Sequence, residues 1–397
     1  MSNQVHVLTL GYATELHQQS GEAASDGVQR REAFAERLGS YTHLTLTLAR
    51  DSYAERQYRN IHAIPTNGRN LPHALWRMYR IGSRLCAEGK VNVIQTQEAN
   101  TTGLVGYLLK LHFGLPLSIC VFGPNPWDEH WVNSSSYNRF STPLACHVLR
   151  RCDRIIADGS LTLERLRKVG IPEERLVWKV NVPSNIDDFA NADGRDLRRR
   201  LLEDSFEHLL LFIGSMSIQK NIPFVLRAFK YIADRMPTSR LVMIGKGRRR
   251  QDYMALVEQL GLGNRVHWIE AVPHADIPAY FRASDLVLLG SRFEGFPRVF
   301  VEAAAAGRPV VTTEVSGCGD GVIDGVNGYV VAQGDVGAFG GRVTELLNDP
   351  DKAAEMGQKG QQLIRELADK RDTFNQLQVE VWDSIRGETN TKAKPYA

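Results

Sequence analysis

The chain has 397 residues, which is more than one hydrophobic core usually fills, so two domains are expected. Hydrophobic residues make up 43% of the chain and charged residues 23%, and these fractions exclude a disordered or fibrous protein. The net charge of +3 is small for this length, whereas a nucleic-acid-binding protein would carry a stronger basic excess.

Short β-branched runs alternate with helical periodicity along the whole chain, which predicts parallel sheets built from βαβ units. In the first half, strands are expected at 5–10, 43–48, 91–96, 117–122 and 154–158. In the second half, strands are expected at 209–214, 240–245, 265–270, 286–290 and 309–313. Helical patterns include 26–38 and 73–86, and the last one covers about 373–386. Two doubly wound units in tandem explain these series better than one large sheet.

The boundary between the two units is expected at 181–196. This segment is polar, contains Pro183 and Gly194, and lacks the periodicity of a helix or strand. The tail that follows the last helical pattern is also polar, and we expect it to be frayed.

The five cysteines predict neither a disulfide framework nor a metal site. Their number is odd, no Cys-x-x-Cys motif occurs, and no cysteines and histidines stand at zinc-binding spacing. No apolar run approaches the roughly 18 residues of a membrane span, and residues 1–12 enter an alternating strand without a signal-peptide core. We therefore expect a soluble cytoplasmic protein or, at most, one that is peripheral at the inner membrane face.

The helical pattern at 73–86 is the segment that would make such a membrane contact. It places Trp76 and Tyr79 near Arg77, Arg80 and Arg84 at helical spacing. A basic helix with aromatic residues can lie on an anionic membrane surface. The alternative, which the sequence favours, is an amphipathic helix packed on the sheet, with arginine stems that cover apolar surface.

Two common nucleotide-binding signatures are missing. Neither Gly-x-Gly-x-x-Gly after the first strand nor Gly-x-x-x-x-Gly-Lys-Ser/Thr occurs, so a dinucleotide oxidoreductase and a P-loop enzyme are not supported. Glycine turns follow several strands instead, among them Gly214 and Gly245. Ligands of open α/β sheets bind at the carboxyl ends of the strands, so a site is expected at these turns.

The stretch FEGFPRVFVEAAAAG (293–307) is the most informative of these turns. Glu294 follows a buried strand, Gly295 allows close approach of a ligand to the backbone, and Pro297 suits the first position of a helix. The N-terminus of that helix would attract a phosphate, and Glu294 and Glu302 would accept hydrogen bonds from sugar and ribose hydroxyls. The alternative is that Glu294 complements the helix dipole and Glu302 is a surface residue.

The segment SRFEGFPRVFVEAAAAGRPVVTT resembles the Glu-x7-Glu segment of the retaining glycosyltransferases of family 4, which have the GT-B fold. The likeness extends over the second half in the family's order, through LLLFIGSMSIQKNIPFVLRAF, RLVMIGKG, LGLGNRVHWIEAVPHADIPAYFRASDLVLLGS and GVIDGVNGYVV. The first half matches loosely, through DGVQRREAFAERL, RCDRIIADGSLTLERLRKVGIP and NVPSNIDDF.

This resemblance implies an α/β fold of two Rossmann-like doubly wound domains that face each other across a cleft, with a C-terminal helix that returns to the N-terminal domain. The expected organisation is an acceptor-side domain (1–182), a linker (183–205), a nucleotide-sugar-binding domain (206–370), a crossover helix (371–388) and a tail (389–397).

The resemblance also implies roles for particular residues. Glu294 would lie at the hexose, Glu302 would hold the ribose hydroxyls, and Lys220 would bind phosphate and stabilise the leaving nucleoside diphosphate. The remaining donor-binding positions are Gly295, Phe296, Pro297, Gly214, Ser215, Gly245 and Val272. No cofactor and no metal are implied, because the nucleoside-diphosphate sugar is a substrate.

The chain departs from the family pattern at two positions. Ser215 stands where the family usually has an arginine, and Arg292, Arg298 and Lys246 are candidates for the missing charge. Phe122 stands where a histidine is common; His130 is a candidate substitute, and a loop histidine without a role is the alternative. Gly27 would let the N-terminal domain approach the donor phosphate, and an ordinary helix cap explains it equally well.

The expected activity is transfer of a hexose-type sugar, with retention, from a nucleoside-diphosphate sugar to a glycan or lipid-linked acceptor in cell-surface polysaccharide or glycoconjugate synthesis. The acceptor would meet the loop at 95–103, where Glu98 is a candidate contact. The sequence does not decide whether the nucleoside of the donor is uridine or guanosine. Alternatives are a sugar-nucleotide epimerase or phosphorylase of the same fold, and a non-catalytic nucleotide-sugar-binding partner. No nucleic acid partner is expected.

Overall fold

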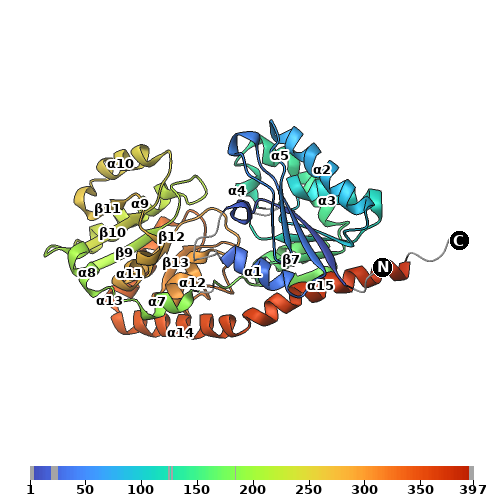
Figure 1. Cartoon of the computed structure of the whole chain (residues 1–397). Coiled ribbons are helices and arrows are strands. Elements are labelled where there is room, and N and C mark those ends of the chain that lie inside the picture. The colour runs from blue at the N-terminus through green and yellow to red at the C-terminus, as the bar shows by residue number, and fades with distance from the viewer. Residues whose placement is uncertain (1–3, 19–25, 124–125, 127, 184, 393–397) are drawn as a thin grey trace. The chain divides into compact units, whose positions relative to one another are not determined.

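The computed structural model describes residues 4–18, 26–123, 126, 128–183 and 185–392, and it divides into two compact units (Figure 1). The first unit is drawn from Met1–Asp158, Thr162–Asn181 and Lys370–Ala397, and the second from Gly159–Leu161 and Val182–Asp369. The segment 183–205, expected as a linker, contains two helices of the second unit, α7 (Ile186–Asn191) and α8 (Arg195–Leu202).

The described residues of the first unit form an eight-stranded sheet in the order β3-β4-β2-β1-β5-β6-β7-β8. Its neighbouring strands are parallel except for β3, which pairs antiparallel with β4. The strands are β1 (His6–Gly11), β2 (Ser40–Thr45), β3 (Arg56–Tyr58), β4 (Ile61–Pro65), β5 (Val93–Thr96), β6 (Leu117–Val121), β7 (Arg154–Ala157) and β8 (Leu176–Trp178). Every residue of β5 and β6 is buried, as is typical of strands covered on both faces.

Helices connect and cover these strands. They are α1 (Asp26–Ala35), α2 (Leu71–Ala87), α3 (Thr101–Phe113), α4 (Glu129–Val132), α5 (Ser136–Leu149) and α6 (Ser160–Lys168), with 3₁₀ turns at Thr14–His17, Ala49–Asp51 and Glu173–Arg175. The side chain of Asn70 caps α2, because it accepts a hydrogen bond from the backbone N–H of His73 at 3.0 Å. The side chain of Ser135 caps α5 in the same way.

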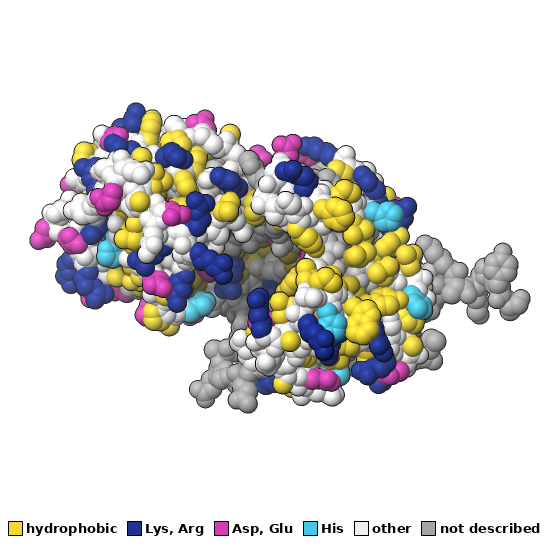
Figure 2. Space-filling view, turned by 90° about the horizontal axis from the view of Figure 1, so that it is seen from above, with side chains coloured by type: hydrophobic (Ala, Val, Ile, Leu, Met, Phe, Trp, Pro, Cys, Tyr) yellow, Lys and Arg dark blue, Asp and Glu magenta, His cyan; other side chains and the backbone are white. Residues whose placement is uncertain are grey.

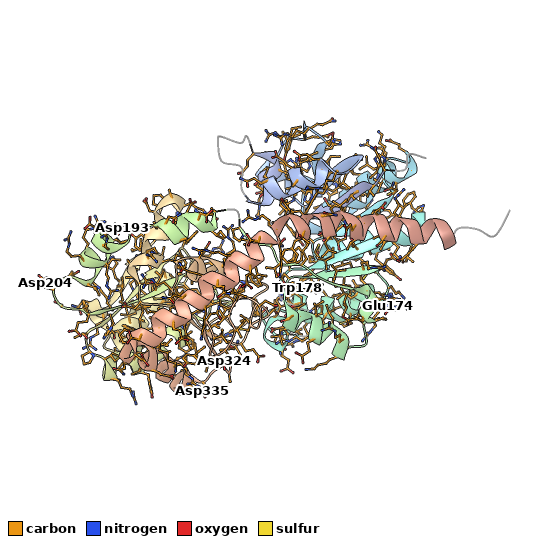
Figure 3. All side chains as sticks on the ribbon, turned by 90° about the horizontal axis from the view of Figure 1, so that it is seen from below. Glu174, Trp178, Asp193, Asp204, Asp324 and Asp335 are labelled. Carbon is orange, nitrogen blue, oxygen red and sulfur yellow. The ribbon has the colours of Figure 1, made fainter. Side chains whose placement is uncertain are left out.

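The last helix, α15 (Arg371–Lys392), packs on the first unit, as expected for the returning C-terminal helix. Trp382 is fully buried, and its indole N–H donates to Oε1 of Gln95 in β5 at 2.8 Å. The ring of Phe34 meets Trp382 edge to face, with centroids 5.5 Å apart. At the start of the helix, Phe374 meets Trp178 of β8 in the same manner, at 5.4 Å. Figure 3 labels Trp178, which lies near the start of α15. This apolar face fixes α15 to the sheet.

The described residues of the second unit form a six-stranded, wholly parallel sheet in the order β11-β10-β9-β12-β13-β14. The strands are β9 (His208–Ile213), β10 (Ser239–Ile244), β11 (Val266–Ile269), β12 (Leu286–Leu289), β13 (Val310–Thr313) and β14 (Gly328–Val331). Besides α7 and α8, its helices are α9 (Ile222–Arg235), α10 (Arg250–Gln259), α11 (Ile277–Ala283), α12 (Arg298–Ala305), α13 (Val336–Asn348) and α14 (Pro350–Asp369), with 3₁₀ turns at Gly263–Arg265 and His274–Asp276.

The core of the second unit lies between this sheet and its helices. Phe224 and Phe229 of α9 are buried there, and Phe224 meets Phe339 of α13 edge to face at 5.2 Å. The buried side chains of α9 recur at helical spacing, which is the pattern expected of a helix with one face on a sheet.

Several local expectations differ from the structure. The strand expected at 43–48 is β2, which begins at Ser40 and ends at Thr45, and four strands of the described chain, β3, β4, β8 and β14, were not predicted. Three of these lie at sheet edges, where runs are short and the apolar signal is weak. Pro297 precedes α12 as its N-cap residue and does not occupy the first helical position. None of the helices among the described residues is long and apolar enough to span a membrane.

Candidate functional site

The candidate donor site lies at the carboxyl edge of the six-stranded sheet. The chain leaves β9 toward β10 and β11 on one side and later returns to β12 on the other, so the strand order reverses between β9 and β12. Such a switch point opens a crevice at the carboxyl ends of the strands. The loops after β9, β10 and β12 meet here: the N–H of Met216 donates to the carbonyl of Lys246 at 2.8 Å, and the N–H of Arg292 to that of Gln219 at 2.8 Å.

Two of the glycine turns hold these loops close together. A Cβ placed on Gly245 would lie 1.9 Å from the carbonyl oxygen of Gly214, so no larger residue fits there without a backbone shift. A Cβ placed on Gly214 would lie 3.2 Å from Cε of Lys220. Because neither glycine has a side chain, the backbone at Gly214 and Gly245 and the side chain of Lys220 can lie within one small volume.

Lys220 and Glu294 form an ion pair at the centre of this edge. Nζ of Lys220 lies 2.6 Å from Oε1 of Glu294, and the two side chains are only 14% and 10% exposed. The second oxygen, Oε2, accepts from the amide of Gln219 at 3.0 Å, and Oε1 also accepts from the hydroxyl of Ser291 at 2.7 Å. The carboxylate is thus held by three donors from two separate loops.

A further layer of hydrogen bonds fixes the loop that carries Ser291. Its carbonyl oxygen accepts from the hydroxyl of Thr313 at 2.7 Å and from the amide of Gln333 at 2.9 Å. The same amide donates to the carbonyl of Glu314 at 2.9 Å. Because these donors come from β13 and from the loop after β14, the position of Glu294 is set by the fold before any ligand binds.

The Gly-Phe-Pro turn leads into α12 as the sequence suggested. Pro297 provides no side-chain cap for the helix, and its ring is buried. A Cβ on Gly317 would lie 2.7 Å from Cδ of Pro297, and one on Gly321 would lie 3.0 Å from Cζ of Phe296. The glycine-rich loop after β13 therefore packs directly on the turn.

Glu302 is the fifth residue of α12, and its side chain is only 12% exposed. This burial argues against the alternative that Glu302 is a surface residue. Its Oε1 lies 3.5 Å from Nε of Arg298, which is thereby engaged within the helix. The pair lies one turn into α12, on the same helix that follows Glu294.

The remaining donor-side positions lie in the loops at this edge. Ser215 is exposed, and its hydroxyl donates to that of Ser217 at 3.1 Å. Lys246 and Arg292, the other candidates for the missing arginine charge, are exposed in the loops after β10 and β12. Val272 follows β11 and is half-buried.

The N-terminal candidates lie in the first unit. Gly27 is the second residue of α1, and its carbonyl accepts from Arg31 at 2.8 Å, so it belongs to a helix and not to a glycine turn. His130 lies in α4, and its side chain falls outside the described part of the chain. Glu98 caps α3: it accepts from the N–H of Thr101 at 2.9 Å and from the hydroxyl of Thr102 at 2.8 Å.

A pocket of about 270 Å³ lies at the carboxyl edge of the first unit's sheet, between the ends of β1, β5 and β6. Four aromatic residues of the described chain line it, namely Tyr12, Phe122, Trp131 and Tyr137. Gln97, Glu98 and Asn100 provide polar groups. Burial, and next the charge of Glu98, raise the pKa of Tyr12, which keeps its phenol neutral. Phe122, noted as a departure, is therefore part of an aromatic lining.

Sequence reasoning missed Gln219, Ser291, Thr313 and Gln333 around the carboxylate. Gln219 directly precedes Lys220, and Ser291 stands three residues before Glu294, so their nearness in sequence was a usable signal. Thr313 and Gln333 carried no such signal, because their contacts depend on strand order. Among the described residues, no group of three or more histidine, cysteine, aspartate or glutamate side chains is arranged to hold a metal ion.

Comparison with known proteins gives matches over both halves of the chain. Residues 3–178 match the family described as Glycosyltransferase Family 4, and residues 193–363 match the family described as Glycosyl transferases group 1.

Among individual relatives, a D-inositol 3-phosphate glycosyltransferase of Segniliparus rotundus is 27% identical over 276 residues, which is 65% of this chain and 59% of that protein. An alpha-D-kanosaminyltransferase of Streptomyces kanamyceticus is 26% identical over 261 residues, 64% of this chain and 66% of the relative. The match thus spans about three fifths to two thirds of the length of these curated relatives.

Solved structures share the fold at low sequence identity. Sucrose-phosphate synthase of Thermosynechococcus elongatus superposes with a TM-score of 0.79 at 18% identity, over 96% of this chain and 100% of that one. Anabaena HepE in complex with UDP-glucose gives a TM-score of 0.68 at 18% identity, over 97% and 99% of the two chains.

Proposed function

The chain belongs to glycosyltransferase family 4 and has the GT-B fold, and from this premise we propose that it transfers a hexose-type sugar, with retention, from a nucleoside-diphosphate sugar to a glycan or lipid-linked acceptor. The observation that carries the proposal is the buried pair of Lys220 and Glu294 at the switch point of the second sheet. A pair that only stabilised the fold would not need to lie at the edge where such sheets bind ligands.

The proposed role of Lys220 is to bind the diphosphate of the donor. An ammonium group carries three donors, and one of them is directed to Glu294. A phosphate oxygen that approached Nζ would gain a charge-assisted hydrogen bond from a cation that is already oriented and largely shielded from water. In this proposal Lys220 supplies the positive charge that stabilises the departing diphosphate, and no metal ion is needed.

The proposed role of Glu294 is to bind the sugar. Its carboxylate accepts three hydrogen bonds within the protein and has room for a further donor, because a carboxylate offers about four acceptor positions. A sugar hydroxyl is a suitable further donor. Glu302, one turn into α12, would accept from the ribose hydroxyls.

In the proposed reaction, the bond between the anomeric carbon and the β-phosphate oxygen breaks, and the electron pair stays on the phosphate. A bond forms on the same face between the anomeric carbon and the acceptor oxygen. The proton of the acceptor hydroxyl passes to an oxygen of the leaving diphosphate. Positive charge develops on the sugar in the transition state, and Glu294 and the phosphate are the nearby negative groups that would stabilise it.

For the acceptor we propose the aromatic pocket of the first unit. Its size, about 270 Å³, suits a sugar residue or a fragment of similar size more than a whole glycan chain. Aromatic faces pack well against the apolar C–H faces of sugar rings, and Gln97 and Asn100 could orient the hydroxyls.

Uridine diphosphate is the first donor nucleotide to test, since the similar structure of HepE was solved in complex with UDP-glucose. The experiment incubates the purified chain with a panel of uridine- and guanosine-diphosphate sugars and records thermal stabilisation and released nucleoside diphosphate. We expect at least one donor to stabilise the chain, and Glu294→Ala to abolish transfer while the fold persists. Glu355→Ala, at an exposed position of α14, is the matched control.

The outcomes separate the alternatives. Change of the sugar in the absence of an acceptor would indicate an epimerase. Binding of a donor with no turnover across acceptors would indicate a non-catalytic partner. Near-normal transfer by Glu294→Ala would contradict the role proposed for that residue.

We also propose that the chain contacts a membrane peripherally, through an apolar patch of the first unit. The patch comprises Leu71, Trp76, Leu108, Leu111, Phe140 and Leu144, on the neighbouring helices α2, α3 and α5. Phe140 is 86%, Leu111 62% and Trp76 52% exposed. Figure 2 shows hydrophobic side chains gathered over this part of the first unit, with basic and histidine side chains between them.

The charges around the patch favour an anionic surface. The 17, 13 and 14 residues of α2, α3 and α5 contain no aspartate or glutamate, whereas they carry Arg77, Arg80, Arg84, Lys110 and Arg139. Lys110 is paired with Asp153, and the guanidinium of Arg80 lies 5.0 Å from the ring centre of Trp76. Exposed apolar side chains with adjacent cations are the combination that binds anionic lipid headgroups.

Vesicle sedimentation tests this contact. We expect the chain to bind vesicles that contain phosphatidylglycerol, to bind less at high salt, and to ignore phosphatidylcholine vesicles. The double variant Leu111→Ser/Phe140→Ser should reduce binding about tenfold or more. Met254→Ser, at an exposed apolar position of the second unit, is the control. Equal binding by both variants would mean that the patch does not contact the membrane.

A further inference from the structure

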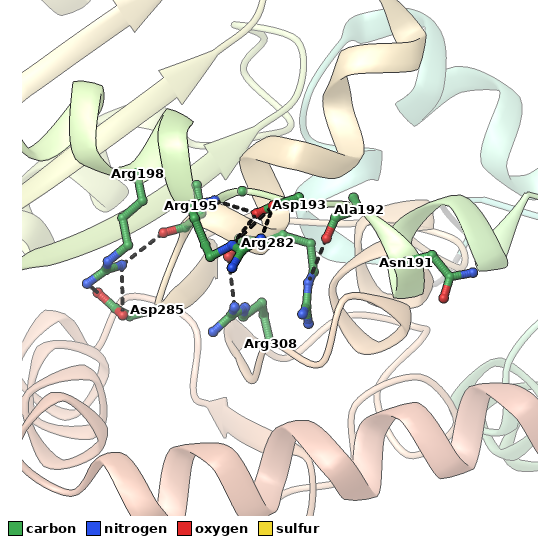
Figure 4. Close-up of a pocket in the computed structure, with 10 residues that line it drawn as sticks. Asn191, Ala192, Asp193, Arg195, Arg198, Arg282, Asp285 and Arg308 are labelled. Atoms are coloured by element: carbon green, nitrogen blue, oxygen red, sulfur yellow. Dashed lines mark hydrogen bonds and ion pairs between the residues drawn. The ribbon is translucent and has the colours of Figure 1, made fainter.

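A second polar cavity of about 630 Å³ lies in the second unit, at the opposite edge of the sheet from the donor site. It lies beside the amino ends of β9, β12 and β13, and its walls come from the α7–α8 connection, the end of α11 and the residues before β12 and β13. Its charged lining residues are Arg195, Arg198, Arg282, Arg308, Asp193 and Asp285 (Figure 4). Four guanidinium groups thus share the cavity with two carboxylates.

Two of the arginines are satisfied by protein groups. Arg198 forms an ion pair with Asp285 at 2.9 Å and donates to the carbonyls of Ala283 and Glu207, each at 2.8 Å. Arg195 forms a bidentate pair with Asp193 at the exposed rim, with a shortest distance of 2.6 Å. Both carboxylates are therefore engaged by these two arginines.

Among the described residues, Arg282 and Arg308 form no such ion pair with a carboxylate. Arg282 donates to the carbonyls of Ala192 and Ala306, at 3.2 Å and 2.9 Å, and Arg308 donates to the carbonyl of Arg282 at 2.8 Å. The Nε of Arg308 is buried and has no hydrogen-bond partner in the described structure. A buried charged donor without an acceptor is costly, and native proteins rarely leave one.

Electrostatics agree with this geometry. Burial, and next the charge of Arg282, lower the pKa of Arg308, while Asp285 acts in the opposite direction. The charges of these neighbouring guanidinium groups are therefore mutually unfavourable in the absence of a further anion.

A purely structural reading is that these arginines complement the C-terminus of α12. Ala306, which accepts from Arg282, is the C-cap of that helix, and Arg308 follows two residues later. This explains the need for positive charge near Ala306, but not why four arginines border an open cavity or why Nε of Arg308 lacks an acceptor.

We propose that this cavity is a binding site for a phosphate-bearing anion, distinct from the donor site, with Arg282 and Arg308 as its central ligands and Arg195 at its rim. Guanidinium groups match the oxygens of phosphate in geometry and charge. The volume suits a small phosphorylated molecule. Because the donor site lies at the carboxyl ends of the same strands, the anion and the donor nucleotide would bind at the same time.

The test is calorimetric titration of the full chain with inorganic pyrophosphate. The wild type should show two sites, one weakened in Lys220→Gln and the other in Arg308→Gln. We expect Arg308→Gln to weaken the second site about tenfold or more and Arg195→Gln to weaken it about threefold, whereas Arg365→Gln, on the exposed side of α14, should have no effect.

Binding of uridine diphosphate checks that each arginine variant is folded, and this binding should be unchanged in Arg308→Gln. If Arg308→Gln failed to fold, Arg195→Gln and Arg308→Lys would carry the test. Pyrophosphate and phosphatidate vesicles, titrated separately into this series, distinguish a soluble ligand from a lipid headgroup. Pyrophosphate binding that depended on Lys220 alone, or that survived all arginine variants unchanged, would overturn the proposal and leave the glycosyltransferase proposal intact.

Discussion

Breaking the ion pair between Lys220 and Glu294 should reveal how strongly the donor site is organised before ligand binds. The variants are Lys220→Met, Glu294→Gln and the two combined. The pair is short, 2.6 Å, and its side chains are 14% and 10% exposed, so removal of one partner leaves a mostly buried charge without its counter-charge. Such losses cost about 3–5 kcal/mol.

The lower end of that range applies to Lys220→Met, because Gln219 and Ser291 still donate to the carboxylate. It also applies to Glu294→Gln, because the glutamine keeps an oxygen that can accept from Lys220. We therefore expect each single variant to lose about 3 kcal/mol of unfolding free energy. The double variant leaves no unpaired charge, so its loss should not exceed the roughly 3 kcal/mol of a single variant, which corresponds to a coupling energy of at least about 3 kcal/mol.

Hydrogen exchange of the backbone amides in β9 and β12 measures the stability of the second unit alone. Costs that simply added up in the double variant, to about 6 kcal/mol, would show that the two side chains are not coupled and would refute the reasoning. Uridine diphosphate should stabilise Glu294→Gln more than the wild type, because the phosphates restore negative charge beside Lys220.

Further predictions concern catalysis, pH and packing. Lys220→Met should lower kcat by about 10²–10³ while transfer remains measurable in a coupled assay of released nucleoside diphosphate, and an unchanged kcat would exclude its role at the leaving group. Burial, and next the charge of Arg30, lower the pKa of Lys179 from 10.5 to about 7, so the unfolded chain binds more protons above pH 7. The free energy of urea unfolding of the first unit should therefore rise by about 1.4 kcal/mol per pH unit between pH 7 and 9. Lys179→Met should lack this rise. If the free energies of both proteins changed with pH in parallel, the lowered pKa of Lys179 would be disproved. Gly245→Ala should destabilise the second unit by about 2 kcal/mol and weaken nucleotide binding, whereas Gly341→Ala, with open space around its Cβ position, should be neutral or stabilising in the same thermal scan.

The fold was largely readable from the sequence because most strands are buried apolar runs followed by helical periodicity. β9 and β12 are such runs, and each was predicted to within about one residue at its ends. β3 and β8 were missed because each has three residues at a sheet edge and carries too little apolar pattern.

The candidate site was readable in part. Glu294, Gly295 and Pro297 stand together in one turn, and local spacing was enough to relate them to the helix that follows. The pairing of Glu294 with Lys220 is different, because 74 residues separate them in the chain. The contact of Gln219 with Glu294 spans 75 residues, so it was not predicted, although Gln219 directly precedes Lys220.

By itself, the sequence determined the alternation of strands and helices, the glycine turns and the position of the two glutamates on and before one helix, since these follow from local periodicity and backbone sterics. Only the tertiary structure decided which distant residues meet. The strand order places β9 beside β12, which brings Lys220 to Glu294, and it gathers Arg198, Arg282 and Arg308 at the opposite edge. Contacts of this kind depend on how the sheet is assembled, and no local pattern in the chain records that order.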